Sequence, residues 1–463
     1  MNTHALGTIY GDDQDVLAAQ SARYRQAREG FLARFGPGPV MAFRTPGRIN
    51  LIGEHTDYNG GFVMPVALDK DVLFLVRPRQ DSTVRAINSE SAFAPFAFAL
   101  SAEIPPAPHG DWSNYFRGAG GEICRRFGEQ VPIKGMDVLV SGTAPYGVSR
   151  GSGLSSSTAL TVNAALALVT LNEIPVSRPD LAHLCSEAEW YVGTRGGMMD
   201  QFSALLGRRD HALFLDCRPS PQGIYALDHV PVPDSVQIVL LNSGVRHENV
   251  RGAFNQRVAE CKIGVKLLQS GYPTITHLRD ATPETLELSE SDFWTMLEDV
   301  LPVRASHEAL IRRGLDRRWL EDLIADHRLA AGVPFEVLPR CRHVITENER
   351  VLAGVTALRA GQVETFGHLM DAAHISMRDD YGASCPEVDT LVEIAWRQPC
   401  VLGARITGAG WGGGVAALVR RGRGADWIDD VRSAYERTTG LTPEIIVCRP
   451  GDGAGQVENL SLG

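Results

Sequence analysis

The chain has 463 residues, of which 44% are hydrophobic and 22% charged, which is typical of a globular protein and not of a disordered or fibrous one. Its net charge of −10 argues against nucleic-acid binding, and no apolar run is long enough to cross a membrane. The eight cysteines are scattered without a CxxC pair, a pattern typical of neither a zinc site nor a disulfide scaffold. We therefore expect a cytoplasmic protein, long enough for two or more domains.

Hydrophobic periodicity and turn residues predict the elements in chain order. Helices are expected at residues 14–34, 158–171, 181–192 and 346–359, with a charged helical stretch at 278–340. Strands are expected at residues 72–76, 83–87, 136–140, 238–241, 415–419 and 444–447. Prolines cluster at residues 228–235 and suggest a boundary there. We predict an N-terminal extension with a helix (1–40) and two α+β domains, residues 41–228 and 229–463, the second with a helical insertion at about 278–340.

A glycine- and serine-rich loop, "APYGVSRGSGLSSSTAL", leads into the helix expected at residues 158–171. The start of a helix presents unpaired amides and the positive end of the helix dipole, so such a loop suits an anion. Gly147, Gly151 and Gly153 would let the backbone approach a bulky ligand, and Ser155–Ser157 add hydroxyls for phosphate or Mg²⁺. No lysine follows the glycines, so this is not a Walker A loop, and a simple capped buried helix stays an alternative.

A second segment, "TPGRINLIGEHTDYNGG", places Arg48, Glu54, His55 and Asp57 within ten residues. Carboxylates and an imidazole on a glycine-punctuated segment suit the recognition of a polyhydroxyl ligand, although a solvated surface turn would look the same. A metal site is weakly supported because no second histidine is near. The third segment, "RITGAGWGGG", is a loop whose backbone could pass close to a ligand or to another loop.

Two further carboxylate sites stand out. Asp200 lies among apolar residues and glycines in "GGMMDQFSALLG", where it is either a structural cap or a poised base. Glu187 and Glu189 on the preceding helix could meet Mg²⁺ or could simply face solvent.

Taken together, the three glycine-bearing segments resemble the galactokinase branch of the GHMP kinases. "GRINLIGEHTDYNGG" is similar to the galactokinase signature, "GSGLSSSTAL" to the phosphate loop of the superfamily, and "TGAGWGGG" to its third motif. Shorter stretches, "DWSNYFRG", "NSGVRH" and "SMRDDYGASCPEVD", are also similar to galactokinase segments. The resemblance implies a two-domain α+β GHMP kinase fold, with ATP and sugar in the cleft between the domains. It implies transfer of the γ-phosphoryl group of ATP to the anomeric hydroxyl of galactose.

The resemblance also assigns roles. Asp200 would be the general base, or would hold the proton late in a loose transition state. Arg48 would keep Asp200 ionised and stabilise the charge of the moving phosphoryl group. The sugar would be bound by Glu54 and His55 near the 6-hydroxyl, by Asp57 at ring hydroxyls, by Gly197 near C2, and by Phe254. The ATP site would comprise Trp112 beside the adenine and the loop residues Gly151, Ser152, Gly153, Leu154, Ser155, Ser156 and Ser157.

Several positions depart from the common galactokinase pattern. The usual Mg²⁺ glutamate position holds Ala188 here, so we expect Glu189, with Ser157, to meet Mg²⁺, and Glu187 is the alternative. Phe254 stands where most galactokinases have a tyrosine, and Arg195 and Arg150 have no assigned role. These changes leave N-acetylgalactosamine 1-kinase open as an alternative activity. A non-catalytic galactose and ATP sensor is a second alternative, and we expect a monomer or a weak homodimer.

Overall fold

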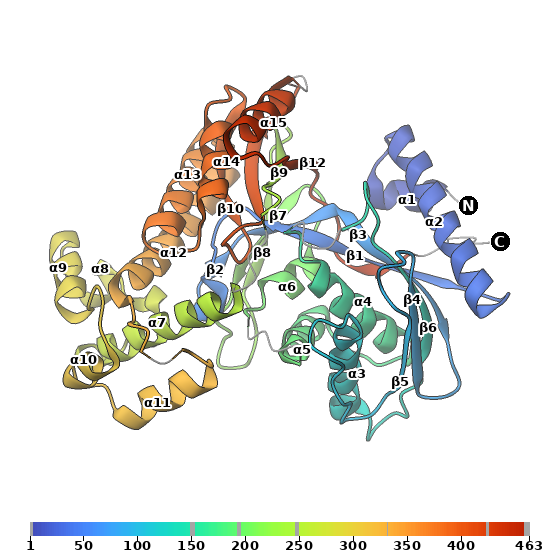
Figure 1. Cartoon of the computed structure of the whole chain (residues 1–463), viewed down its shortest axis with the longest axis horizontal. Helices are drawn as coiled ribbons and strands as arrows, with labels where there is room; N and C mark the ends of the chain where they lie inside the picture. The colour runs from blue at the N-terminus through green and yellow to red at the C-terminus, as the bar shows by residue number, and fades with distance from the viewer. Residues whose placement is uncertain are drawn as a thin grey trace. The chain divides into compact units, whose positions relative to one another are not determined.

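The computed structural model describes residues 3–148, 153–191, 196–245, 250–330, 332–422 and 426–457. The chain forms two compact units, each assembled from segments far apart in the sequence (Figure 1). Unit 1 comprises Met1–Ile49, Pro65–Leu213 and Cys448–Gly463, and unit 2 comprises Asn50–Met64 and Phe214–Val447. The linear boundaries predicted at residues 40 and 228 stay a prediction, because these units are defined by contacts between distant segments.

Unit 1 is built on a six-stranded sheet in the order β13-β1-β3-β6-β4-β5. In that order the strands span Gly455–Gln456, Met41–Asn50, Pro65–Pro78, Met136–Ser141, Thr83–Asn88 and Phe96–Ala99. β6 pairs antiparallel with β3 and parallel with β4, so the sheet is mixed. The helices are α1 (Thr3–Tyr10), α2 (Gln14–Phe35), α3 (Ser113–Phe127), α4 (Ser156–Leu171), α5 (Arg178–Trp190) and α6 (Met199–Leu206).

Alternate residues of β3 face two different layers of helices. Leu73 and Leu75 pack with Phe31 of α2 in one core, on the face that α1 and α2 cover (Figure 1). Phe74 points to the opposite face, where its ring stacks on Phe116 of α3 with the centroids 5.2 Å apart. α4 contacts β3, α3, α5 and α6, which explains why its sequence is apolar nearly all round.

Unit 2 contains a four-stranded sheet in the order β10-β11-β9-β12 and takes part in a three-stranded sheet, β2-β7-β8. The strands span Val401–Thr407, Gly414–Arg420, Val236–Asn242, Glu444–Cys448, Phe62–Val63, His211–Asp216 and Leu227–Pro231 in that order. The larger helices are α7 (Val250–Gly271), α12 (Val337–Arg359), α13 (Val363–Asp379), α14 (Pro386–Trp396) and α15 (Asp426–Thr439). No helix in the described part of the chain combines the length and apolarity needed to cross a membrane.

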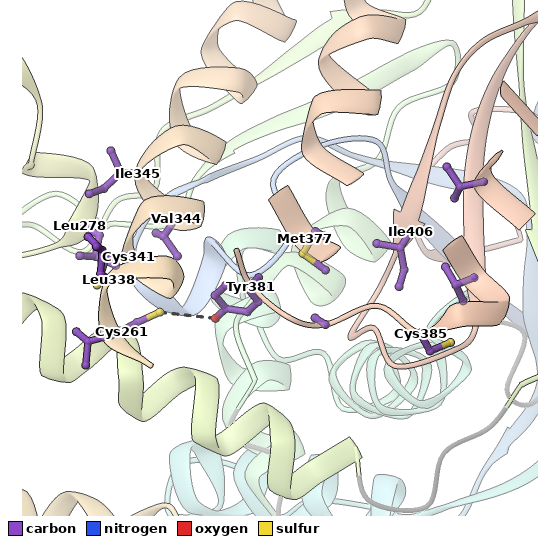
Figure 2. Close-up of a cluster of buried hydrophobic side chains, with 14 of the residues drawn as sticks. Cys261, Leu278, Leu338, Cys341, Val344, Ile345, Met377, Tyr381, Cys385 and Ile406 are labelled. Atoms are coloured by element: carbon purple, nitrogen blue, oxygen red, sulfur yellow. Dashed lines mark hydrogen bonds between the residues drawn. The ribbon is translucent and has the colours of Figure 1, made fainter. Parts of the chain in front are cut away.

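The stretch predicted to be helical, residues 278–340, consists of short helices before α12. They are η2 (Leu278–Asp280), α8 (Pro283–Leu286), α9 (Glu290–Val300), α10 (His307–Arg312) and α11 (Arg317–Asp326). Thr282, Ser289, Ser306 and Asp316 cap the four α-helices through their side-chain oxygens, so local sequence sets their starts. Figure 2 shows part of the core of unit 2, in which Cys261 of α7 lies near Tyr381.

Candidate functional site

Arg48 and Asp200 form a two-bonded ion pair in unit 1. Arg48 lies near the end of β1, and its Nε donates to Asp200 Oδ1 at 2.6 Å while its Nη2 donates to Oδ2 at 2.8 Å. The third nitrogen, Nη1, donates to the carbonyl oxygen of Gly153 in the glycine-serine loop at 2.9 Å. The Arg48 side chain is 8% exposed and that of Asp200 23%, so the carboxylate keeps some access to solvent. The fold therefore brings together the two residues that were predicted to act as a pair, although they lie 152 positions apart in the sequence.

Ser155 joins this pair from the start of α4. Its backbone is left-handed, with φ 56°, a conformation that costs a serine about 1–3 kcal/mol and is concentrated at functional sites. Within the described residues its hydroxyl caps no amide of the helix, and it hydrogen-bonds Asp200 instead. The start of α4, with its outward amides and positive dipole end, thus lies beside the Asp200 carboxylate.

Gly47 explains how β1 comes so close to the loop. A Cβ at this position would lie 2.8 Å from the Leu154 carbonyl oxygen and 2.8 Å from a Val148 methyl carbon. The neighbouring Arg48 amide donates to the same Leu154 carbonyl at 3.2 Å. The glycine before Arg48 is therefore required for a close backbone approach.

A cavity of about 170 Å³ lies next to this loop in unit 1. Its wall includes Ser156 and Ser157, at the start of α4, and Trp112. Trp112 is also a packed aromatic: its Nε1 donates to the Ala94 carbonyl at 2.9 Å, and its ring meets Phe96 edge-on at 4.6 Å. Trp112 is thus a packed aromatic that also lines the cavity, and its place beside the adenine stays a prediction.

Sequence reasoning did not assign most of the residues that line the same cavity, and four of these are polar or aromatic. They are Asn88, Glu90, Phe93 and Tyr115. Asn88 ends β4, and Glu90 and Phe93 follow in a loop with no motif around them. Tyr115 lies in α3 within "DWSNYFRG", so its resemblance to a galactokinase segment was the signal that could have found it.

Glu189, on α5, has a carboxylate whose surroundings suit a cation ligand. Its Oε1 is buried and has no hydrogen-bond partner among the described residues. Burial raises the pKa of Glu189 to about 7, and the charge of Asp200 adds to this effect. Hydrogen bonds from Thr158 and Gln201 oppose this rise in pKa, so only Oε1 of Glu189 lacks a partner among the described residues. Glu187 instead pairs with Arg126.

The described residues contain no cluster of three or more His, Cys, Asp or Glu side chains that could hold a metal by itself. That does not conflict with Mg²⁺, which usually takes one or two protein ligands and fills its shell with phosphate and water. A buried carboxylate oxygen without a partner fits such a cation.

In unit 2, Glu54 lies in a buried ion network. Its Oε1 accepts from the Gly408 amide at 2.8 Å and from Arg405 Nη1 at 3.4 Å. Gly408 belongs to the third glycine-rich segment, which therefore packs against the galactokinase-like signature. Arg405 is completely buried, and its Nη2 also lies 3.9 Å from Glu347 of α12.

Side chains of α12 hydrogen-bond the backbone of the signature segment. Glu347 accepts from the Gly53 amide at 2.8 Å and from Arg350 Nε at 2.7 Å. Burial opposes the charged form of Glu347, but Arg350 and Arg405 outweigh it and lower its pKa to about 2. His343, one turn earlier, contacts the Glu54 carbonyl through Nε2 at 3.1 Å. Sequence reasoning missed these residues because they lie about 290 positions from the segment that they support.

His55 is enclosed by aromatic rings. Its Nδ1 is 2.6 Å from the Tyr58 hydroxyl, which is 2.6 Å from the Tyr381 hydroxyl, and Tyr381 in turn contacts the Cys261 sulfur at 3.6 Å (Figure 2). The ring of Phe254, from α7, lies 5.7 Å from that of His55. Burial lowers the pKa of His55 well below 6.5, so the imidazole is neutral.

The remaining predicted residues are placed as follows. Asp57 opens a short 3-10 helix (Asp57–Asn59) in unit 2 and is partly exposed. Gly197 is partly buried, three positions before Asp200 in unit 1. Gly151 and Ser152, together with Arg150 and Arg195, lie outside the described residues.

Comparisons with known proteins identify the family of the chain. The family model of the galactokinase galactose-binding signature matches residues 29–78, that of the GHMP kinases N terminal domain residues 114–208, and that of the GHMP kinases C terminal residues 355–437. Galactokinase of Roseiflexus sp. (strain RS-1) is 37% identical over 437 residues, covering 93% of this chain and 97% of the relative. Galactokinase of Chloroflexus aggregans is 36% identical over 424 residues, covering 91% and 95%.

Solved structures give the same result. The crystal structure of Lactococcus lactis galactokinase complexed with galactose matches with a TM-score of 0.75 and 30% identity, covering 95% of this chain and 99% of that one. A mevalonate kinase structure matches with a TM-score of 0.54 at 15% identity, which shows a shared fold only. The predicted two-domain α+β GHMP kinase fold is confirmed, and none of these comparisons favours the alternative activities.

Proposed function

The chain belongs to the galactokinase family of the GHMP kinases, and from this premise we propose that it phosphorylates the anomeric hydroxyl of galactose with ATP, giving galactose 1-phosphate and ADP. The observation that carries the proposal is the two-bonded Arg48–Asp200 pair beside the start of α4. The pair brings a carboxylate, a guanidinium and the start of a helix close together, and phosphoryl transfer to a hydroxyl uses groups of these kinds.

We assign the proton transfer to Asp200. As the anomeric oxygen bonds to the γ-phosphorus, the bond from that phosphorus to the bridging oxygen of ADP breaks, and the hydroxyl proton passes to the Asp200 carboxylate. Arg48 orients the carboxylate through both of its oxygens, and its charge opposes the negative charge of the moving phosphoryl group.

The nucleotide would occupy the cavity of unit 1, with Trp112 beside the adenine. Gly151, Ser152, Gly153 and Leu154, with Ser155 and Ser156, would surround the triphosphate through backbone amides and hydroxyls. The amides at the start of α4 and their dipole would take the part that a lysine takes in a Walker A loop.

Ser157 and Glu189 would hold Mg²⁺. The Glu189 oxygen without a partner, in a buried setting that favours neutralisation of its charge, supports this assignment. Held there, Mg²⁺ would supply positive charge that neutralises the charge developing on the phosphate oxygens.

The sugar would be bound by the signature segment. Glu54 and His55 would face the 6-hydroxyl, Asp57 the ring hydroxyls, and Gly197 the C2 side. Phe254 offers a ring without a hydroxyl group, so it would contribute an apolar contact only. A cytoplasmic location and a monomer or weak homodimer remain predictions from the sequence.

A kinase assay over a panel of sugars tests the activity. Galactose, galactosamine and N-acetylgalactosamine are each supplied with Mg·ATP, and ADP release is followed. We expect the highest kcat/KM with galactose. Absence of turnover on all three sugars would refute the proposal, and sugar binding without ADP release would identify a sensor.

Asp200→Asn tests the base. The change keeps the shape of the side chain but removes the proton acceptor, so kcat should fall by about 10²–10⁴-fold. Calorimetry should show that galactose still binds with an affinity within a few-fold of the parent. The exposed Asp299, changed to Asn, serves as a control that should keep full activity. An Asp200→Asn variant with near-normal kcat would contradict the assigned role.

A further inference from the structure

A buried polar cluster joins the two N-terminal helices to the sheet of unit 1. Asp71, in β3, is completely buried, and its carboxylate accepts from Tyr10 at 2.6 Å, from Arg23 at 2.8 Å and from Arg44 at 2.8 Å. Tyr24 of α2 hydrogen-bonds the Tyr10 hydroxyl at 3.0 Å. Burying two guanidinium groups around one carboxylate is costly, and the apolar packing of α2 already attaches it to the sheet. Stability alone therefore does not account for this cluster.

The guanidinium of Arg23 also holds backbone carbonyls from three segments. Its Nη2 donates to the carbonyl oxygens of Asp71 at 2.8 Å and Ser141 at 3.0 Å, and its Nη1 lies 3.5 Å from that of Tyr146. Asp71 belongs to β3, Ser141 ends β6, and Tyr146 lies in the turn that leads into the phosphate loop. Two backbone hydrogen bonds also join β3 to this turn: the Asp71 amide donates to the Tyr146 carbonyl oxygen, and the Val148 amide donates to the Asp71 carbonyl oxygen.

Each of these carbonyls lies next to the wall of the nucleotide cavity. The cavity is lined by Val72, Gly142 and Val148, which follow Asp71, Ser141 and Tyr146 by one, one and two positions. A shift in any of the three segments would therefore move the wall of the cavity.

We infer that Arg23 is a positioning residue for the nucleotide site, acting through the backbone at the base of the phosphate loop. The N-terminal extension is then a working part of the ATP site. This inference rests on the proposed function only in identifying the ligand of the cavity as a nucleotide.

The charge of the cluster supports this role. Burial opposes ionisation of Asp71, but Arg23 and Arg44 outweigh it and hold the pKa of its carboxyl below its usual value. Two guanidinium groups and one carboxylate leave a net positive charge at the base of the loop, which itself carries Arg150 and no lysine. A buried positive charge is screened little by salt and favours a nearby anion.

The test compares two substitutions of Arg23. Arg23→Met removes the charge and all carbonyl contacts, while Arg23→Lys keeps the charge beside Asp71 but lacks the fork that reaches three carbonyls. We expect Arg23→Lys to raise both the KM for ATP and the calorimetric Kd for Mg·ADP by about tenfold, with the KM for galactose within twofold, because small displacements of a binding loop are costly. Arg23→Met, where it folds, should show a larger change in the same direction.

Two controls separate positioning from stability. Tyr10→Phe removes one bond to Asp71 but leaves every carbonyl contact, so it should lower Tm without changing the Kd for Mg·ADP. Arg25→Met makes the same charge change as Arg23→Met on the exposed side of α2 and should change neither quantity. A folded Arg23→Lys variant with parental Mg·ADP affinity, or with equal losses for nucleotide and galactose, would overturn the inference. The Mg·ADP measurement needs no sugar turnover. It therefore still tests the role of Arg23 if the galactose assay fails.

Discussion

At the scale of single residues, two glutamates on α5 have opposite environments. Glu187 is paired with Arg126, whereas the buried Oε1 of Glu189 has no partner among the described residues. Because the pKa of Glu189 is about 7, its carboxyl is about half protonated at neutral pH. A cation at this oxygen must displace that proton, so binding of Mg²⁺ there should depend on pH.

Glu189→Gln tests this dependence. In the parent, the Mg²⁺ concentration that gives half-maximal activity should fall as pH rises through about 7, because the carboxylate form predominates above its pKa. Glu189→Gln should need at least about tenfold more Mg²⁺ and should lose that pH dependence. Glu187→Gln on the same helix should behave as the parent. If Glu187→Gln weakens Mg²⁺ and Glu189→Gln does not, the ligand assignment is wrong.

At the scale of elements, a close contact between α3 and α5 sets the place of Glu189. A Cβ on Gly118 of α3 would lie 2.4 Å from the carbonyl oxygen of Ala188, the residue before Glu189. The position held by a glutamate in common galactokinases is thus a buried alanine in this chain, packed on a glycine. The helix pair determines which side chain of α5 lies beside Asp200.

Gly118→Ala should separate the two helices. Although alanine gains about 1 kcal/mol of helix propensity over glycine, the overlap with a backbone carbonyl should lower the free energy of unfolding by about 1–3 kcal/mol net. Displacement of α5 should also weaken Mg²⁺ binding. Gly121→Ala, three positions later, would meet nothing closer than 3.8 Å and should be neutral or stabilising. Equal stability of the two variants in urea unfolding would disprove the close contact.

At the scale of the whole molecule, two buried groups, Glu189 in unit 1 and His343 in unit 2, shift stability with acid in opposite directions. Glu189 in unit 1 has a folded pKa above its unfolded value, so the folded state binds more protons and gains stability as pH falls from about 7 towards 4.5. His343 in unit 2 has a pKa that burial lowers to about 4, so the unfolded state takes its proton first and stability is lost as pH falls below 6.5. The pKa of His55 is lowered too, and it acts in the same direction as His343.

Single variants should separate these contributions. Between pH 8 and pH 5 each of Glu189 and His343 changes the free energy of unfolding by about 2 kcal/mol, with opposite signs. Scanning calorimetry should therefore show that Glu189→Gln makes acid more destabilising and that His343→Gln makes it less so, by about 4–8 °C in Tm in each case. If Tm changes with pH to the same extent in both variants and in the parent, the buried environments assigned to Glu189 and His343 are wrong.

Motifs carried by contiguous residues were predictable from the sequence. The glycine-serine loop, the signature around Glu54 and the segment around Asp200 are local patterns, and together they indicated the family, the α+β fold and the reaction class, which the comparisons confirm. The roles of individual residues stay predictions, although the structure does place Arg48 on Asp200 as the sequence led us to expect.

Contacts between distant segments were decided only by the tertiary structure. Glu347 supports the signature and Arg23 contacts the base of the phosphate loop, yet neither lies in a motif; Arg405 opens the third glycine-rich segment, but its burial against Glu54 and Glu347 was not predictable. The sequence already led us to expect Glu189 rather than Glu187 as the Mg²⁺ ligand, but the pairing of Glu187 with Arg126, on a different helix, appears only in the structure. The physical reason is that burial and ion pairing are properties of a side chain's neighbours in space, which may be hundreds of positions away, whereas a motif records only neighbours in sequence.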